Sequence, residues 1–326
     1  MMQLTSLGRL QGVSRLTLGG GGLGRVWGET SIEEAVATVH AAVDGGINLI
    51  DTAPMYRDCE QVIGAAFSGR LPNGVRITTK HQLGAPLAGE TAGRLEASLD
   101  ASLAAMQVSR ADIYFLHSNI CPDGYVYARH PERQAMFATP WRTYVDEVIP
   151  AMEGLKARGR IRAWGITGVG VPDTILGALA HDTAPDVVQA IANLLDSPGG
   201  MRSYAEAPRP REIIAAAQSR RIGCMGIRAV QAGALTAAID RNLSPNHPES
   251  TDYVLATPFR VLCDELGSDP ATVAHRYALT MAGVDTVILG VKNRAELADC
   301  LEAEALGALP PELIARIDSL GLRQPS

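Results

Sequence analysis

Four side chains that could perform acid–base chemistry follow or end three apolar segments of the sequence. Asp51 and Tyr56 follow the apolar run 47–50, Lys80 ends the segment VRITTK, and His117 follows the segment DIYFL. Apolar runs of this length, rich in branched residues and bounded by turn formers, predict buried strands. In α/β proteins, the carboxyl ends of such strands hold the catalytic side chains. We therefore expect the four side chains to converge if the three strands are neighbours.

The chemistry of this group suits the transfer of a proton to or from a substrate oxygen. Tyr56 can donate a proton and then hold charge as a phenolate, but an ordinary tyrosine pKa of about 10 is too high for easy exchange near neutrality. The ammonium of Lys80 would lower that pKa, and Asp51 would pair with Lys80 and orient it. His117 can donate a hydrogen bond to a carbonyl oxygen. Such a set suits addition of hydride to C=O, or its removal from CH–OH, with Tyr56 as proton donor or acceptor.

Each of these residues, considered alone, also has a structural explanation. Asp51 could be a turn residue, Tyr56 a half-buried aromatic, Lys80 a solvated strand end and His117 a hydrogen-bonded core histidine. The occurrence of all four in order favours the catalytic interpretation. No protein side chain carries hydride, so the interpretation implies a nicotinamide coenzyme.

Strands and helices that could position these residues alternate along the whole chain. Strands are expected at 14–18, 47–51, 75–81, 112–117, 161–167, 185–191, 222–228 and 284–290. Helices are expected at about 31–43, 60–67, 90–106, 143–157, 171–179, 210–219, 257–266, 270–281 and 294–305. Strict alternation predicts a parallel sheet covered on both faces, and eight units predict closure into a (β/α)₈ barrel. We expect one α/β domain over residues 1–326, with no linker.

Two long segments without regular structure are expected between these elements, at 118–140 and 230–257. Loops of this length in a compact domain usually bind a ligand or cover a site. Trp27 in the first loop, Ser118 beside His117, and Trp141 after the long loop are candidate substrate-binding residues, together with Tyr56 and His117. The two tryptophans could equally be packing residues.

The glycine run Gly19–Gly22 could allow a ligand to approach the backbone closely. It lacks the G-x-G-x-x-G spacing, and we do not expect it to lead directly into a helix. The run is therefore not interpreted as a Rossmann fingerprint.

Composition excludes several classes of protein. The chain of 326 residues carries a net charge of −6, which argues against nucleic acid or an anionic membrane as its main partner. No apolar run approaches the roughly 20 residues of a membrane-spanning helix. The first residues lack the apolar region of a secretory signal, and the five cysteines are scattered and form no C-x-x-C pair. Reduced thiols and a cytoplasmic protein are therefore expected. Nothing in the sequence indicates an oligomeric state.

The four candidate residues and their flanking sequences resemble the aldo-keto reductase superfamily. The segments NLIDTAPMY, ITTK and YFLH match the strand-end Asp and Tyr, the Lys and the His of that superfamily, in the same order. The similarity runs from about residue 14 to residue 305. It implies an NAD(P)H-dependent reductase or dehydrogenase with a dinucleotide extended across the barrel mouth.

The coenzyme-binding segments of the superfamily are matched less fully. The segment GITG ends in Gly168 where the superfamily usually has the Asn that holds the nicotinamide carboxamide, although Thr167 and Gln189 match the other carboxamide ligands. Ile227 stands where an aromatic residue usually stacks on the nicotinamide. This GITG variant is similar to the branch that holds L-galactose dehydrogenase and related aldose dehydrogenases. The full set of implied coenzyme-binding residues is Gly21, Gly22, Thr167, Gly168, Gln189, Ile227, Arg228, Gly290, Lys292, Arg294 and Glu296.

The nucleotide is predicted to be NADPH, with NADH as the alternative. Lys292 and Arg294 lie where the resemblance places the adenosine ribose, and two cations could hold a 2′-phosphate. Glu296 opposes this choice, because a carboxylate there repels phosphate. Lys292 and Arg294 could also be only the solvated start of the last helix.

The predicted substrate is a small carbonyl or hydroxyl compound, such as an aldehyde, a ketone or a sugar. Two other functions remain open at this point. In one, the barrel is a lyase or aldolase in which Lys80 forms a Schiff base. In the other, the protein is a weakly catalytic sensor that binds the coenzyme.

Overall fold

Eight parallel strands form a closed barrel in the computed structural model, which describes residues 2–323. The strands are β3 (Leu16–Gly19), β4 (Leu49–Asp51), β5 (Arg76–His81), β6 (Ala111–Leu116), β9 (Ile161–Thr167), β10 (Val187–Ile191), β11 (Gly223–Ile227) and β12 (Thr286–Leu289). They follow one another around the ring in chain order, and β12 pairs with β3 to close it. The predicted (β/α)₈ barrel is confirmed.

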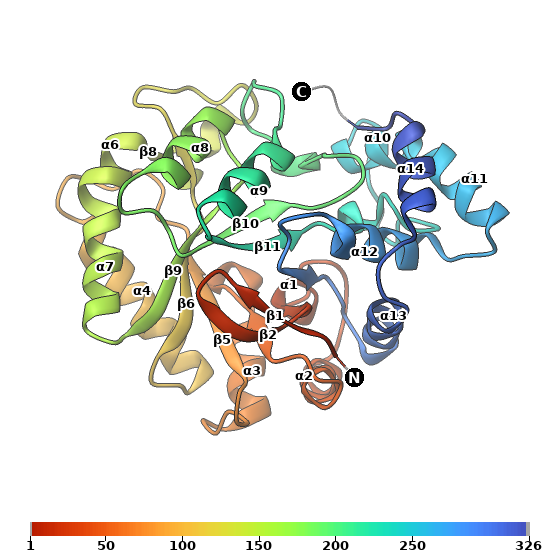
Figure 1. Cartoon of the computed structure of the whole chain (residues 1–326). Coiled ribbons are helices and arrows are strands. Elements are labelled where there is room, and N and C mark those ends of the chain that lie inside the picture. Colours follow the sequence, from red (N-terminus) through yellow and green to blue (C-terminus); the bar gives the residue numbers. More distant parts are fainter. Residues whose placement is uncertain (1, 324–326) are drawn as a thin grey trace.

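Helices surround the ring on its outer side (Figure 1). They include α2 (Ile32–Asp44), α3 (Cys59–Phe67), α4 (Thr91–Met106), α7 (Ile149–Ala157), α8 (Pro172–Ala180), α9 (Pro210–Ser219), α12 (Pro270–Thr280) and α13 (Arg294–Ala305). Side chains alternate between the two faces of each strand. In β5, Ile77 joins the core between strands and helices, whereas Thr78 and Lys80 face the barrel interior, where both contact Asp51. The strand period therefore carries Lys80 into the site.

An N-terminal hairpin that was not predicted lies across the ring of strands (Figure 1). Its strands are β1 (Leu4–Leu7) and β2 (Leu10–Ser14), which pair antiparallel. Leu7 and Val13 pack against barrel residues such as Val187 and Met225. The turn residue Gly8 has a φ of +56°, and a Cβ there would lie 2.6 Å from the Gly223 nitrogen. Because that nitrogen begins β11, the hairpin covers the amino-terminal end of the barrel and leaves the carboxyl end open to the loops.

The glycine run differs from the prediction. Gly19 ends β3, and the short helix α1 (Gly20–Leu23) begins at once. A Cβ on Gly22 would lie only 2.0 Å from the carbonyl oxygen of Val291. The low helix propensity of glycine argued against a helix here. The close packing of this backbone against the loop after β12 explains why Gly22 has no side chain.

The long segments contain more regular structure than expected. Residues 118–140 hold the two-stranded parallel sheet β7 (Asn119–Cys121) and β8 (Ala138–Pro140), as well as α5 (Gln134–Phe137). The segment 141–157 begins with α6 (Trp141–Thr143) and a π-helical turn (Tyr144–Val148). The second long segment holds α10 (Pro248–Leu255), and α11 (Thr257–Glu265) follows it. The helix α14 (Pro311–Ser319) lies beyond the last predicted element.

Two expectations from the composition concern the cysteines and membrane-spanning helices. All five cysteines are free and buried, and no two of them form a disulfide. Among residues 2–323, no helix is both long and apolar enough to cross a bilayer.

Candidate active site

A buried ion pair lies at the centre of the predicted group. The ammonium of Lys80 donates to Asp51 Oδ2 at 2.5 Å and to the carbonyl oxygen of Thr52 at 3.0 Å. Lys80 is fully buried and Asp51 is 2% exposed. Burial lowers the pKa of Lys80, but the charges of Asp51 and Tyr56 outweigh it, so the net pKa is raised. Lys80 is therefore a permanent cation at neutral pH.

The ring of Tyr56 lies beside this cation. The Lys80 nitrogen is 4.7 Å from the centroid of the Tyr56 ring, and the Tyr56 side chain is half-buried. Burial raises the pKa of Tyr56, whereas the charge of Lys80 lowers it, and the net pKa is raised. The sequence predicted the lowering by Lys80 correctly but did not include the larger effect of burial.

His117 completes the group from the loop after β6. Its ring meets the Tyr56 ring edge to face, with centroids 6.0 Å apart and an interplanar angle of 89°. Burial, with smaller contributions from Lys80 and His81, lowers the pKa of His117 to about 3, so the ring is neutral near neutrality. Its buried Nδ1 has no hydrogen-bond partner within the described chain. We assign the ring proton to Nε2, which leaves Nε2 as a donor.

Gln189 and Thr167 bring polar groups to the same interior. Gln189 is 4% exposed, and its Nε2 donates to Asp51 Oδ1 at 2.7 Å. A carboxylate only accepts, so this contact identifies the amide nitrogen and leaves Gln189 Oε1 without a donor from residues 2–323. Thr167, on the neighbouring strand β9, lies in register with Gln189 and brings a hydroxyl. Gln189 thus presents an acceptor and Thr167 a hydroxyl, and these two groups could bind the NH₂ and the oxygen of a carboxamide.

Gly168 and Ile227 differ from an ordinary carboxamide and stacking site. A Cβ on Gly168 would lie 2.9 Å from the carbonyl oxygen of Gln189 and 3.0 Å from Val188. Because that space is filled, an Asn at this position would require the backbone to shift. Ile227 is half-buried at the end of β11 and packs beside the apolar cluster that contains Tyr127 and Tyr204.

Arg228 lies in a buried network away from the four catalytic candidates. Its guanidinium bonds to Glu249 Oε1 at 2.5 Å and to Gln231 Oε1 at 2.8 Å. Gln231 in turn donates to Asp252 at 2.7 Å. Arg228 therefore joins α10 to the end of β11, and its predicted contact with the coenzyme stays a prediction.

Each of the two cations near the start of α13 is paired with carboxylates. Lys292 contacts Asp240 and, at 2.9 Å, Glu296, whereas Arg294 pairs with Glu34 at 2.9 Å. Asn293 caps α13 by accepting from the Glu296 nitrogen, and Glu296 accepts from the Lys292 nitrogen at 2.9 Å. Glu296 therefore reaches back to the residue before the N-cap, one position beyond the contact of a true capping box, and it has a structural role at the helix start.

Gly21 and Gly290, which are predicted to bind the coenzyme, lie beside Trp27, a candidate substrate-binding residue. A Cβ on Gly21 would lie 2.6 Å from the indole nitrogen of Trp27, and one on Gly290 would lie 3.8 Å from it. Gly290 is exposed, so its backbone is open to a ligand. The guanidinium of Arg241 stacks 5.3 Å from the Trp27 ring. Trp27 therefore lies beside the expected coenzyme path, whereas Gly22 packs against Val291.

Ser118 and Trp141, two of the candidate substrate-binding residues, both make contacts within the protein. Ser118 is fully buried, and its hydroxyl accepts from the Gly84 nitrogen at 2.8 Å. Trp141 packs against Tyr144, with ring centroids 5.7 Å apart, and against Gly177 of α8. Both residues anchor the long loop to the barrel and its helices. Ser118 shows that adjacency to His117 in the sequence does not determine the direction of a side chain.

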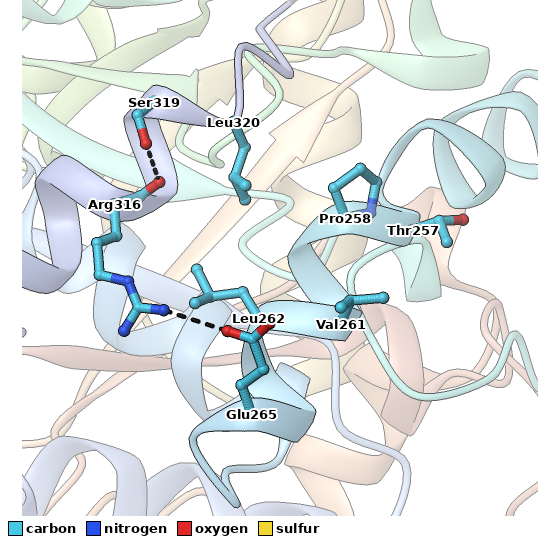
Figure 2. A pocket seen from close by; sticks show the side chains of 8 residues that line it. All are labelled: Thr257, Pro258, Val261, Leu262, Glu265, Arg316, Ser319 and Leu320. Atoms are coloured by element: carbon cyan, nitrogen blue, oxygen red, sulfur yellow. Dashed lines mark hydrogen bonds and ion pairs between the residues drawn. The ribbon is translucent and has the colours of Figure 1, made fainter.

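A surface hollow between α11 and α14 is separate from this group (Figure 2). Apolar side chains such as Val261 and Leu320 line it, and an ion pair between Arg316 and Glu265 at 3.2 Å crosses it. None of the four catalytic candidates lines this hollow.

Fold and site together define a class of protein. A (β/α)₈ barrel carries, at the carboxyl ends of its strands, a buried Asp–Lys pair beside a half-buried Tyr and a neutral His. Residues 15–321 match the Aldo/keto reductase family. The chain belongs to this family and is therefore an NAD(P)H-dependent oxidoreductase, as the resemblance implied.

Individual relatives are distant. The L-galactose dehydrogenase of Arabidopsis thaliana is 24% identical over 320 residues, which cover 94% of this chain and 90% of that protein. A methylglyoxal reductase of Escherichia coli strain K12 is 30% identical over 142 residues, 42% of this chain and 40% of that protein.

Solved structures share the fold. The glycerol dehydrogenase from Gluconobacter oxydans has a TM-score of 0.71 at 20% identity, with 98% of this chain and 94% of that chain covered. An aldo-keto reductase from Klebsiella pneumoniae in complex with NADPH has a TM-score of 0.68 at 20% identity, with 100% and 97% covered.

Proposed function

We propose that this protein interconverts a small carbonyl compound and its alcohol, with Tyr56 as the proton donor in reduction and the acceptor in oxidation. The observation that carries the proposal is the arrangement of Tyr56 between the buried Lys80 cation and the neutral His117 ring. Tyr56 and His117 are half-buried, whereas Asp51 and Lys80 are buried. The two half-buried groups are thus the ones that a substrate oxygen could reach.

Lys80, Asp51 and His117 have different roles in the proposed reaction. Lys80 stabilises the phenolate that remains after Tyr56 gives up its proton, and Asp51 holds Lys80 in place. His117 Nε2 donates a hydrogen bond to the substrate oxygen and orients it, and its low pKa keeps it from acting as the acid near neutrality. A bound nicotinamide supplies or accepts the hydride.

The residues fit such a coenzyme at the nicotinamide end. The free acceptor of Gln189 and the hydroxyl of Thr167 would hold the carboxamide, and Ile227 would support the ring with an aliphatic surface. Gly21 and Gly290 would lie along the rest of the coenzyme. The filled space at Gly168 removes one carboxamide contact, so the carboxamide is held by fewer groups than in relatives with Asn there.

We propose NADPH as the preferred nucleotide, with Lys292 as the main contact to its 2′-phosphate. Support comes from the position of Lys292 and Arg294 at the start of α13 and from the NADPH in the Klebsiella pneumoniae structure. The carboxylates of Asp240, Glu296 and Glu34 already neutralise these cations, so a 2′-phosphate must compete with them and the preference over NADH is small.

The proposed substrate is a small oxygen-rich carbonyl or hydroxyl compound of the sugar or polyol type. The names of the relatives support this class, since they refer to L-galactose, methylglyoxal and glycerol. We also propose that the protein works in the cytoplasm, which agrees with five free, buried cysteines.

A turnover screen tests the proposal. The purified protein is incubated with NADPH or NADH and a panel of aldoses, ketoses, 2-oxoaldehydes and simple ketones, and with the oxidised nucleotides and the matching alcohols. We expect coenzyme-dependent turnover that is highest for hydroxylated substrates. Tight nucleotide binding without turnover across both panels would support the sensor instead.

The lyase alternative requires a neutral amine at Lys80. The raised pKa of Lys80 and its ion pair with Asp51 disfavour that form. Borohydride trapping tests this directly, because only a Schiff base would link the substrate covalently to Lys80.

A further inference from the structure

One oxygen of Asp51 is held by two donors that the proposed mechanism does not use. Thr78 Oγ1 and Gln189 Nε2 each donate to Asp51 Oδ1 at 2.7 Å. The other oxygen, Oδ2, receives the ammonium of Lys80 at 2.5 Å. All of these side chains are at most 4% exposed, so water does not replace either donor in the folded protein.

The two donors come from different sides of the barrel. Thr78 lies on β5, in register with Asp51 on the adjacent strand β4 and two residues before Lys80. Gln189 lies on β10, which is four strands from β4 in the ring of eight. The amide of Gln189 therefore reaches across the barrel interior to Asp51.

We infer that Thr78 is a positioning residue that, with Gln189, sets how much negative charge Asp51 presents to Lys80 and thereby tunes Tyr56 as a proton donor. Hydrogen bonds to a carboxylate disperse its charge. When a donor is removed, Asp51 neutralises Lys80 more fully and also acts more strongly on Tyr56. Both effects disfavour the phenolate, so the pKa of Tyr56 rises. This inference rests on the proposed function.

The groups around Tyr56 allow the effect to be isolated. The titratable groups that act on it are Lys80 from β5, Asp51 from β4, Cys59 from α3 and His117 from the loop after β6. Within residues 2–323, the hydroxyl of Thr78 donates to Asp51 and makes no hydrogen bond with Tyr56 or His117. A change at Thr78 should therefore reach Tyr56 through Asp51 and Lys80.

The experiment compares Thr78→Val with Thr78→Ser and Thr17→Val. Thr17 is a matched control, because its buried hydroxyl bonds to Thr286 at 2.8 Å inside the same barrel and does not touch Asp51. For each variant we measure the pH profile of kcat, the coenzyme Kd by fluorescence quenching, and thermal unfolding. Thr78→Val should move the limb that reports Tyr56 upward by roughly half a pH unit, with an unchanged coenzyme Kd. Thr78→Ser keeps the hydroxyl and should show the wild-type pH profile, and Thr17→Val should show it as well.

Gln189→Leu extends the test to the second donor. It should move the same limb upward and also raise the coenzyme Kd, because Gln189 serves both Asp51 and the carboxamide. A Thr78→Val profile with an unmoved limb, or an equal shift in Thr17→Val, overturns the inference. If Tyr56→Phe keeps more than about a tenth of the wild-type kcat, the proposed function fails instead, whatever the result at Thr78.

Discussion

Tyr56 experiences two opposing influences that only the folded site brings together. Burial of the phenol favours its neutral form, and the cation of Lys80 favours the phenolate. The neutral form dominates, so the phenol holds the proton that, in the proposed function, it gives to a substrate oxygen. His117 is neutral for a related reason, since burial and two neighbouring basic side chains disfavour a second positive charge.

Tyr56→Phe should abolish turnover and leave nucleotide binding nearly intact. The phenol acts only on the reacting oxygen, and general acid catalysis typically contributes about 10²–10⁴-fold. Steady-state kinetics and nucleotide titration measure the two effects separately. A variant that keeps more than about a tenth of the wild-type kcat would contradict the proton-donor role.

Lys80→Met should lower kcat and shift the pH–rate profile. Without the ammonium, the pKa of Tyr56 rises further above its ordinary value, so the limb that reports the phenolate moves to higher pH. Because the change also leaves Asp51 without its cation, unfolding is measured in parallel. Weaker substrate binding with an unchanged profile would assign Lys80 to positioning alone.

At the scale of elements, the ends of strands and the start of one helix hold the proposed functional groups. The turn after β4 carries Tyr56, β5 carries Lys80, and β10 carries Gln189. Helix α13 begins with Asn293 as its N-cap. Lys292, just before the helix, pairs with Asp240, and Arg294, its first residue, pairs with Glu34. Local helix capping and the proposed nucleotide binding therefore share the same few residues.

Lys292→Ala should weaken NADPH and barely affect NADH. A hydrogen bond between charged groups is worth about 1.5–3 kcal/mol, and we expect the lower end because Asp240 and Glu296 compete for the ammonium. Isothermal titration with both nucleotides gives the comparison. As the converse variant, Asp240→Asn should tighten NADPH. Equal losses for both nucleotides in Lys292→Ala would show that Lys292 does not contact the 2′-phosphate.

At the scale of the whole molecule, two half-buried histidines link folding to pH. Burial lowers the pKa of His117 to about 3, and burial with the charge of Arg94 lowers that of His81 to about 4. In the unfolded chain these groups have pKa values near 6.5. Below that pH the unfolded chain binds more protons than the folded one, so stability is complete above about pH 6.5 and falls as the pH approaches 4.

The change His81→Gln should reduce this acid sensitivity. Between about pH 7 and pH 4.5, we expect the variant to lose about 1–2 kcal/mol less free energy of unfolding than the wild type, after allowance for partial exposure. Urea unfolding at both pH values measures the difference. The exposed His130 provides the control, and His130→Gln should behave as the wild type does. If both variants lose the same free energy of unfolding between the two pH values, groups other than His81 cause the acid sensitivity.

The sequence by itself determined the barrel and identified the candidates for the proposed catalytic group, because both depend on local patterns. Alternating strand and helix periods identified the eight units, and Asp51, Lys80 and His117 are recognisable from the apolar strands that they end or follow. The hairpin β1–β2 escaped prediction because it covers the amino-terminal end of the barrel through contacts with residues far away in the sequence. Side-chain direction was also decided by tertiary packing: Ser118 turns to Gly84, Arg228 to Glu249, and Lys292 to Asp240. The Gln189–Asp51 contact joins residues 138 positions apart, and only the closure of the barrel brings them together.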